Sequence, residues 1–397
     1  MIRKYLIITL AVMLVMSAAF VTTQAQEDVP GVTEDTILLG TSGPMTGPAN
    51  AVGTVIRSME TYFNAVNAEG GINGRQIELI VLDDAYDPAK AQANVRKLIE
   101  DEQVFAVVGV LGASIVESVI DYIDASDVPW VGLISGSRKP STPPRDNVFV
   151  GSPEHYWEAH VLFNYAVSEG GYEKVGIFYQ NDEYGGEGLT GAEDAASLKG
   201  MELVAEVPYE LFDTDFSTHA LKMMQSGADA VLLYGNARFV SAFVKACEAL
   251  GYSPQYFGST PISGAELFDL AGAAWDGALV TTYTPDPFGD DDAVIWYREA
   301  IEKYAENDSD RIVSTSTMKG FYYGDFVVEG LKRAKEPLTR ESFMAAMNSM
   351  DNLDGRFVHG VTYNDEKRNG PSSFYILEAD YENKTFVRVT DWLTPED

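Results

Sequence analysis

The chain alternates short apolar runs with longer amphipathic segments, and this alternation restricts the folds that it can adopt. Over the first part, the predicted strands and helices are, in chain order, 37–40, 54–69, 77–82, 87–101, 105–110, 114–125 and 130–134. A strand, a helix and another strand in succession form a right-handed crossover, and repeated crossovers give a parallel sheet with helices on its faces. The predicted fold class is therefore α/β.

The same alternation begins again after Gly151 and predicts a second parallel sheet. The predicted elements are helices 155–168, 186–198, 216–225 and 237–250, and strands 175–179, 202–207, 230–234, 256–258 and 278–283. A chain of 397 residues with 46% hydrophobic content holds about two domains, at roughly 100 to 200 residues per domain. We therefore expect two α/β units.

The pattern changes after Tyr283. The predicted elements there are helices 293–305, 315–334 and 340–348, followed by strands 357–361, 373–378 and 385–390. These last strands are too closely spaced for helical crossovers, so they should pair antiparallel. The end of the chain is predicted to add β structure to a finished sheet.

The N-terminus has the pattern of a signal peptide. Arg3 and Lys4 precede the apolar run Tyr5 to Val15, and Thr23-Gln24-Ala25 forms a cleavage site. An uncleaved membrane anchor is less favoured, because the run is short for a span of about 20 residues. We expect residues 1–25 to be removed and the mature protein to be periplasmic or secreted, and soluble.

The net charge excludes some classes of binding partner, and the cysteine count excludes an intramolecular disulfide. The net charge of -32 argues against nucleic acids and anionic membrane surfaces, because both are bound by clustered Lys and Arg. Cys247 is the single cysteine of the sequence, so an intramolecular disulfide is impossible. The helical pattern around Cys247 favours a packing role for its thiol.

Catalytic patterns are scarce. None of the four histidines falls in the His-Glu-x-x-His or His-x-x-x-His arrangements of zinc sites, and the sequence has no Gly-x-Ser-x-Gly elbow or Walker A motif. Asp83 and Asp84 end a predicted strand, where capping of the next helix is favoured over metal binding. We therefore expect neither an enzyme nor a cofactor, with a secreted α/β hydrolase as the less favoured alternative.

The stretch Val107 to Glu117 combines a buried strand, a glycine-containing loop and the start of a helix. Ser114 and Glu117 fit a capping box at that helix start. A helix N-terminus beyond the carboxyl end of a parallel strand also suits an anion, because its backbone N–H groups are free there. Both uses of Ser114 stay open, since a hydroxyl can cap and bind at once.

Two further features lie at predicted strand ends. The loop Ser135 to Lys139 follows strand 130–134, so its cations lie at the same sheet edge as Ser114 and favour an anionic ligand group. Tyr184, Tyr234 and Tyr283 each fall at or just past a strand of the second series. If they converge, they line a wall that faces the first unit; each alone is more often a core residue.

A series of short motifs runs through nearly the whole chain after the N-terminal segment. In order they are Gly43-Pro44-Met45-Thr46-Gly47-Pro48, residues 67–75 (Asn-Ala-Glu-Gly-Gly-Ile-Asn-Gly-Arg), Asp83-Asp84 with Asp87-Pro88, Val107 to Ser114, Val128-Pro129 with Ile134-Ser135, Asp182-Glu183-Tyr184-Gly185, Asp215-Phe216-Ser217 and Gly227-Ala228-Asp229-Ala230. With these motifs the chain resembles the type I periplasmic substrate-binding proteins of ABC transporters, specifically the branched-chain amino acid (Leu/Ile/Val) binding family.

The resemblance implies two α/β lobes joined by three crossovers, with the ligand in the cleft and hinge closure around it. It assigns 33–151 plus 284–361 to the first lobe and 152–283 plus 362–397 to the second. It also implies that the loops at Ser114 and at 135–139 hold a ligand carboxylate, while a tyrosine packs on the ligand from the other lobe. The predicted ligand contacts are Ala113, Ser114, Ser135, Ser137, Arg138, Tyr184, Asn236, Thr260 and Tyr283.

Two departures from the family pattern concern charge. The acidic residue that usually takes the ligand ammonium is replaced near Ser259-Thr260, and Arg138 or Lys139 stands where the family has a small or hydroxyl residue. A buried ammonium without a partner costs several kcal/mol. These departures argue against a simple leucine or valine binder and make aliphatic or aromatic carboxylic acids candidates beside amino acids, with Arg138 or Arg238 as candidate counter-charges.

The expected function is that of an exported solute-binding protein that captures a small carboxylate-bearing molecule and delivers it to an ABC permease in the membrane. We expect a monomer that performs no catalysis. The alternative within binding proteins is a sensory receptor of the same fold, for amides or small acids.

Overall fold

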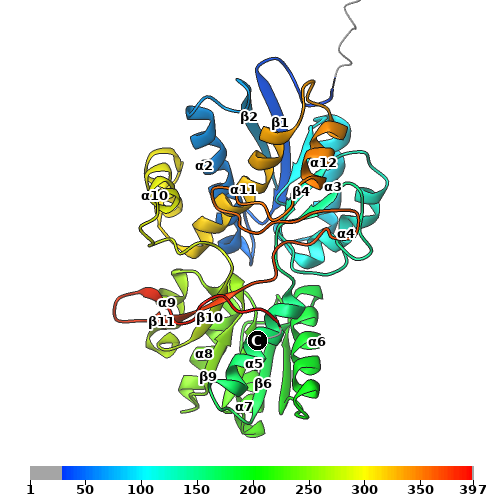
Figure 1. Ribbon diagram of the computed structural model, residues 1–397. Helices are drawn as coiled ribbons and strands as arrows, with labels where there is room; N and C mark the ends of the chain where they lie inside the picture. Colours follow the sequence, from blue (N-terminus) through cyan, green and yellow to red (C-terminus); the bar gives the residue numbers. More distant parts are fainter. Residues whose placement is uncertain (1–28, 396–397) are drawn as a thin grey trace, which may run out of the picture.

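The computed structural model describes residues 29–395 and shows two sheets, each flanked by helices, stacked one above the other (Figure 1). We call each sheet with its helices a lobe. The predicted signal peptide, residues 1–25, lies outside the described residues. Within the described part, no helix combines the length and the hydropathy needed to cross a bilayer. The predicted α/β class with two mostly parallel sheets is confirmed.

The first lobe contains a five-stranded parallel sheet with the strand order β2-β1-β3-β4-β5. Its strands are β1 Thr36–Gly43, β2 Gln76–Asp83, β3 Ala106–Val108, β4 Trp130–Leu133 and β5 Val148–Val150. Strands β3, β4 and β5 are buried throughout, as expected for strands covered on both faces. The sequence pattern predicted the first four strands and missed β5, which has only three residues.

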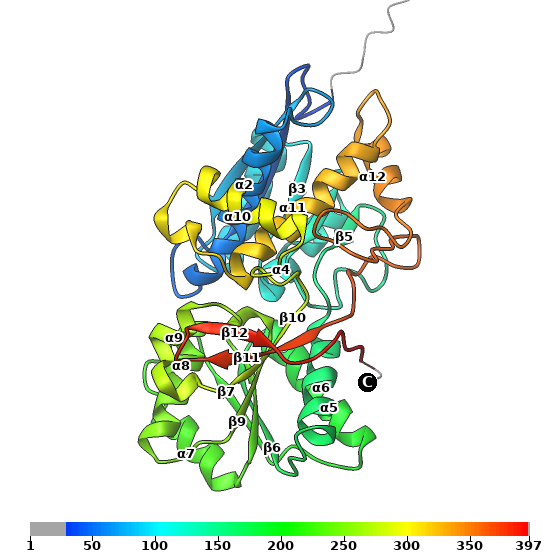
Figure 2. The ribbon, with the colours of Figure 1, turned by 60° about the vertical axis from the view of Figure 1, so that its left-hand side comes forward.

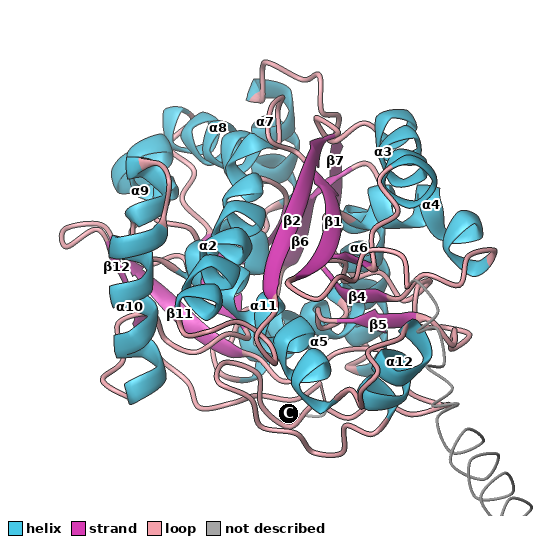
Figure 3. Cartoon of the chain, turned by 90° about the horizontal axis from the view of Figure 1, so that it is seen from above, coloured by secondary structure: helices cyan, strands magenta, loops and turns pink. Residues whose placement is uncertain are grey.

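Helices cover both faces of this sheet. They are α2 Thr54–Ala68, α3 Pro88–Arg96, α4 Ala113–Asp124, α10 Asp292–Tyr304, α11 Thr315–Arg333 and α12 Arg340–Asn348. Seen from above, α2 and α11 lie on one side of β1 and β2, and α3 and α4 lie on the other (Figure 3). Segments far apart in the sequence therefore share one core, in which α11 packs along α2.

The second lobe contains a seven-stranded mixed sheet with the order β12-β11-β10-β9-β8-β6-β7. Its strands are β6 Val175–Gln180, β7 Ala205–Tyr209, β8 Ala230–Tyr234, β9 Gln255–Gly258, β10 Leu279–Thr282, β11 Tyr375–Asp380 and β12 Thr385–Arg388. Strand β11 pairs antiparallel with both β10 and β12, which confirms the predicted β addition at the end of the chain. Figure 2 shows this pair in red beside β10.

Two apolar layers bury the faces of the second sheet. The helices are α5 His155–Ser168, α6 Glu183–Leu198, α7 Ser217–Ser226, α8 Ala237–Ala249 and α9 Glu266–Ala271. Leu162 and Phe163 of α5 pack with alanines of α6 on one face. Phe243 and Cys247 of α8 pack with α7 and α9 residues on the other, and the Cys247 thiol is fully buried.

The chain passes between the lobes three times: between β5 and α5, between β10 and α10, and before β11. Tyr363 and Phe374 pack in the core of the first lobe, and Tyr363 Oη donates to the Val150 carbonyl oxygen at 2.7 Å. The third passage therefore lies just before β11. The predicted lobe boundary at 361/362 falls inside this packed segment.

One predicted strand is wrong. Residues 357–361 form no strand, because the backbone N–H groups of Phe357 and Val358 donate to Asp325 Oδ2, at 2.7 and 3.2 Å, instead of to another strand. Asp325 is fully buried on α11 and also accepts a bond from Tyr62 Oη. The apolar run is thus held as a loop against the helix by a buried carboxylate.

Candidate functional site

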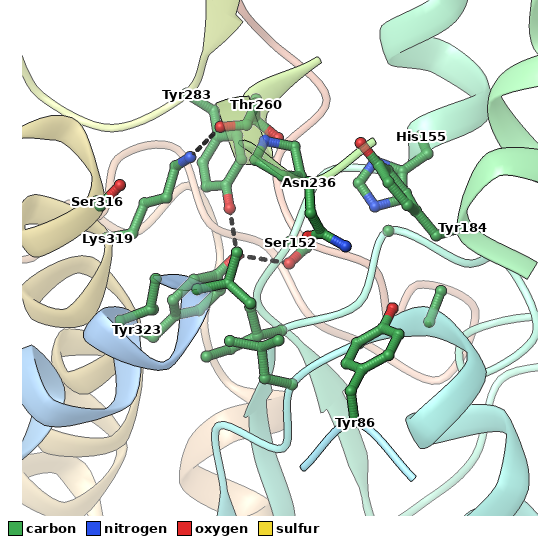
Figure 4. A pocket seen from close by; sticks show the side chains of 18 residues that line it. Tyr86, Ser152, His155, Tyr184, Asn236, Thr260, Tyr283, Ser316, Lys319 and Tyr323 are labelled. Carbon is green, nitrogen blue, oxygen red and sulfur yellow. Dashed lines mark hydrogen bonds between the residues drawn. The ribbon is translucent and has the colours of Figure 1, made fainter. Parts of the chain in front are cut away.

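A cavity lies between the two lobes and takes its walls from both (Figure 4). It contains about 670 Å³ of empty space, a figure that includes the solvent at its opening. The first lobe contributes an apolar wall of Val52, Val55, Leu111 and Ile134. The second lobe contributes polar and aromatic side chains, namely His155, Tyr184, Asn236, Thr260 and Tyr283.

Tyr86 enters the cavity from the loop after β2. Its backbone N–H donates to Asp84 Oδ1 at 2.8 Å, while Asp84 Oδ2 accepts a bond from Ser42 Oγ at 2.7 Å. Opposite the ring, Gly112 precedes α4 with a φ of 111°, and a Cβ on it would lie 2.6 Å from the Tyr86 ring. Gly112 therefore allows the tyrosine to pack against the start of α4, where Ala113 also lines the cavity.

The second-lobe wall is organised by a buried carboxylate, Glu158 of α5. Its side chain is 1% exposed and bonds to the backbone N–H of Thr260 at 2.6 Å and to Thr281 Oγ1 at 2.5 Å. Its other oxygen lies 2.9 Å from His155 Nδ1. Glu158 thus fixes His155 and Thr260 at the cavity surface without lining the cavity itself.

Tyr184 packs on this wall from the first turn of α6. Its hydroxyl lies 2.6 Å from Ser259 Oγ, and its ring centroid is 4.7 Å from that of His155. Tyr234, which we expected to join the same wall, is fully buried behind Tyr184, with ring centroids 5.7 Å apart. It supports the wall and is not among the residues that line the cavity.

The cavity also contains a buried cation, Lys319. Helix α11 begins with a capping box between Ser314 and Thr317, which places Lys319 in the second turn, facing the second lobe. The lysine is 6% exposed, and its Nζ donates to the Thr260 carbonyl oxygen and, at 3.2 Å, to Ser263 Oγ. Burial lowers the pKa of Lys319 to about 8, against the opposing effect of Glu158 and Glu266.

Three hydroxyl groups meet beside Lys319. Tyr283 Oη and Tyr323 Oη are hydrogen-bonded, and Tyr323 Oη lies 2.5 Å from Ser152 Oγ (Figure 4). Ser152 follows β5, Tyr283 follows β10 and Tyr323 lies on α11. This cluster joins two of the passages between lobes to the helix that carries Lys319.

The loop 135–139 lines the cavity at Gly136, and its polar side chains meet the other lobe outside the cavity. Arg138 Nε donates to Glu187 at 2.9 Å, and Lys139 Nζ donates to Glu117 and, at 3.1 Å, to Glu183. We call this set of contacts the interlobe clasp. It also includes Ser137 Oγ donating to Glu183 at 3.3 Å and Ser114 Oγ donating to Asp182 at 3.2 Å. In each cross-lobe contact, the acceptor lies at the start of α6.

Comparison with known proteins agrees with the fold. Residues 36–385 match the family described as Periplasmic binding protein. The chain belongs to this family. It is 28% identical over 277 residues to the Leu/Ile/Val-binding protein homolog 2 of Brucella abortus, covering 68% of this chain and 71% of that protein. The predicted resemblance to the Leu/Ile/Val-binding family is confirmed.

Solved structures of periplasmic binding proteins show the same fold. A branched chain amino acid ABC transporter protein from Thermus thermophilus with bound valine has a TM-score of 0.82 at 21% identity, covering 91% of this chain and 97% of that one. A fatty acid ABC transporter substrate-binding protein from Thermomonospora curvata has a TM-score of 0.81 at 23% identity, covering 92% and 94%. The family consists of binding proteins and not of enzymes.

The predicted ligand contacts divide into two groups. Ala113, Tyr184, Asn236, Thr260 and Tyr283 line the cavity, with Asn236 held by a 2.7 Å bond to Gln180. Ser114, Ser135, Ser137 and Arg138 do not line it in this arrangement. Ser114, Ser137 and Arg138 take part in the clasp, and Ser135 Oγ accepts the Ser137 N–H. A direct contact between these four residues and a solute stays a prediction.

The predicted capping box at Ser114 is wrong. Helix α4 begins at Ala113 after Gly112, so Ser114 is already inside the helix, and Glu117 pairs with Lys139. Neither predicted counter-charge lines the cavity: Arg138 pairs with Glu187 and Arg238 is exposed on α8, so their contact with a solute stays a prediction. Sequence reasoning missed Lys319, Tyr323, Ser152, His155 and Tyr86, all of which line the cavity.

Proposed function

We propose that this protein is the exported solute-binding component of an ABC importer. It holds a small carboxylate-bearing solute in the interlobe cavity and delivers it to a membrane permease. The observation that carries the proposal is the charge of the cavity wall. Among the described residues that line it, Lys319 is a buried cation, and no aspartate or glutamate is present.

The physical argument concerns the cost of a buried charge. An ammonium that is removed from water without an anionic partner is costly, and a solute carboxylate beside it would form a charge-assisted hydrogen bond. The rest of the cavity is largely apolar, which suits the hydrocarbon part of an organic acid. A small carboxylate therefore satisfies both parts of the wall.

The printed names of the relatives support the same class of solute. They refer to leucine, isoleucine and valine in one case and to fatty acids in the other. These molecules differ in size and in amino groups, but all carry a carboxylate. We therefore propose only this shared group, the carboxylate, for the solute of this protein.

A thermal-shift panel of small carboxylates tests the proposal. Each acid is compared with its methyl ester, which keeps the hydrocarbon part and removes the charge. A ligand at 100 times its dissociation constant stabilises the folded state by about 2.7 kcal/mol, which raises the melting temperature visibly. We expect shifts with acids and none with esters. Equal shifts with both would contradict the carboxylate assignment, and native mass spectrometry of solute retained on purification identifies the natural acid.

A further inference from the structure

The ammonium of Lys319 has one more donor than the protein uses. Of its three N–H groups, two are accounted for by the Thr260 carbonyl oxygen and Ser263 Oγ. In the part of the chain that the structure describes, Lys319 forms no ion pair within 4.0 Å. The side chain is nevertheless 6% exposed and lines the cavity. Among the described residues, the third N–H therefore has no hydrogen-bond acceptor.

Two acceptors near this ammonium, the Thr260 carbonyl oxygen and the Glu158 carboxylate, are already occupied. The Thr260 carbonyl oxygen accepts from Lys319 and from Ser263 Oγ. Glu158, the buried carboxylate behind Thr260, bonds to Thr260, Thr281 and His155. A solute that brought its own ammonium to this corner would meet a cation and find these acceptors taken, while a solute carboxylate would meet an unused donor.

Figure 4 shows the part of the cavity around Lys319, Thr260 and Tyr283, which we call the corner. Lys319 reaches from α11 toward Thr260, beside the Tyr283 ring, whose centroid lies 5.8 Å from Nζ. Val52, Val55 and Leu111 supply an apolar wall from the first lobe. The cavity thus has a cationic corner and an apolar body, which matches an acid with its charge at one end.

We infer that Lys319 determines which solutes this cavity accepts: its third N–H receives the solute carboxylate, and its fixed charge selects against an α-ammonium group. The solute class is then carboxylic acids with an apolar body and no α-amino group. This inference rests on the proposed function, because it specifies the solute of the same cavity.

The pH dependence of binding follows from the groups that face Lys319. These are Glu158 on α5, Glu266 at the start of α9 and Tyr283, whose ring centroid lies 5.8 Å from Nζ. His155 and Tyr323 are further titratable residues that line the same cavity. With the Lys319 pKa at about 8, the ammonium is charged at neutral pH and neutral at pH 9.5. Since a carboxylic acid is ionised throughout this range, its affinity should be constant below pH 8 and fall by about tenfold per pH unit above it.

The test compares three probes that share one carbon skeleton: 4-methylpentanoate, leucine and 4-methylpentanamide. The second adds an ammonium group, and the third replaces the carboxylate with a neutral amide. Calorimetry at pH 7 should show that 4-methylpentanoate binds the wild-type protein at least about tenfold more tightly than either of the others. Lys319→Met should remove that preference and weaken 4-methylpentanoate binding by about tenfold or more.

Lys332→Met is the matched control, because Lys332 lies on the same helix but pairs with Glu329 away from the cavity. It should leave all three affinities unchanged. Melting of each solute-free variant checks its folding, and titration of wild-type protein at pH 7 and 9.5 tests the inference without any substitution. In Lys319→Met, the affinity should not change between these pH values.

Two negative outcomes can be told apart. Leucine binding to wild-type protein as tightly as 4-methylpentanoate, or Lys319→Met retaining the preference, would overturn the role of Lys319 and leave the proposed function intact. If no carboxylate in the panel raises the melting temperature, the proposed function fails, and this inference fails with it.

Discussion

Cations at two places contact the opposite lobe, and their surroundings differ. Lys319 is 6% exposed and has no salt bridge among the described residues, whereas the side chains of Arg138 and Lys139 are 40% and 52% exposed and pair with carboxylates. The chain has 60 acidic and 28 basic residues, so an exposed cation readily meets a carboxylate. Lys319, buried on an apolar helix face, interacts with Glu158 and Glu266 only at longer range, so one of its N–H groups stays available for a solute.

The comparison assigns separate tasks to the two regions. The clasp joins the first lobe to the start of α6, so it acts on the arrangement of the lobes and affects every solute alike. Lys319 lies at the cavity wall, so its effect depends on the charge of the solute. Substitutions in the clasp should therefore change the affinities of acid and amide equally, whereas substitutions of Lys319 should change them differently.

The largest effect is expected from charge reversal at the cavity wall. Lys319→Glu replaces an attraction by a repulsion, and we expect carboxylate affinity to fall by at least about 100-fold, or about 2.7 kcal/mol. Binding of 4-methylpentanamide should change much less, because the amide is uncharged. Calorimetry of both probes measures the difference, and a parallel loss for acid and amide would show that the substitution damages the cavity instead.

A smaller effect is expected in the clasp. Arg138 and Glu187 are bonded at 2.9 Å, and Glu187 is 8% exposed, so a double-mutant cycle with Arg138→Gln and Glu187→Gln should give a coupling of about 0.5 to 1 kcal/mol in solute affinity. The coupling should be equal for acid and amide and should weaken at high salt, since Arg138 is partly exposed. A coupling seen only with the acid would indicate that Arg138 contacts the solute carboxylate directly.

The smallest effect is expected at Ser114. Its hydroxyl donates to Asp182 over 3.2 Å at the boundary of the lobes, so Ser114→Ala should cost about 0.5 to 1 kcal/mol of affinity, equally for acid and amide. A loss of about 1.5 to 3 kcal/mol that is confined to the acid would mean that Ser114 holds the carboxylate directly. The two probes measured side by side by calorimetry separate these outcomes.

The sequence predicted the architecture well because the strand and helix periods differ clearly. Helix α5 and strand β8 have the predicted bounds, 155–168 and 230–234. The failures come from tertiary contacts that no local pattern contains. Residues 357–361 have the composition of a strand, but buried Asp325 accepts the N–H groups of Phe357 and Val358.

The site was predicted in part for the same reason. Tyr184 and Tyr283 were predicted at strand ends from the sequence pattern, and they line the cavity together with Asn236 and Thr260, which were predicted only as ligand contacts. The loop 135–139 reaches the correct boundary, but the carboxylates of α6 that neutralise it come from the other lobe. Lys319 did leave a signal: it lies four residues before Tyr323 on an apolar helix face, where a lysine is out of place.

The position of a bound carboxylate tests the account most directly, because the two regions offer it different partners. A crystal structure of the complex with 4-methylpentanoate should place a carboxylate oxygen about 2.7 to 2.9 Å from Lys319 Nζ, with the alkyl chain against Val52 and Val55. A carboxylate bound instead to Ser114 and the loop 135–139, with Lys319 contacting only Thr260 and Ser263, would contradict it.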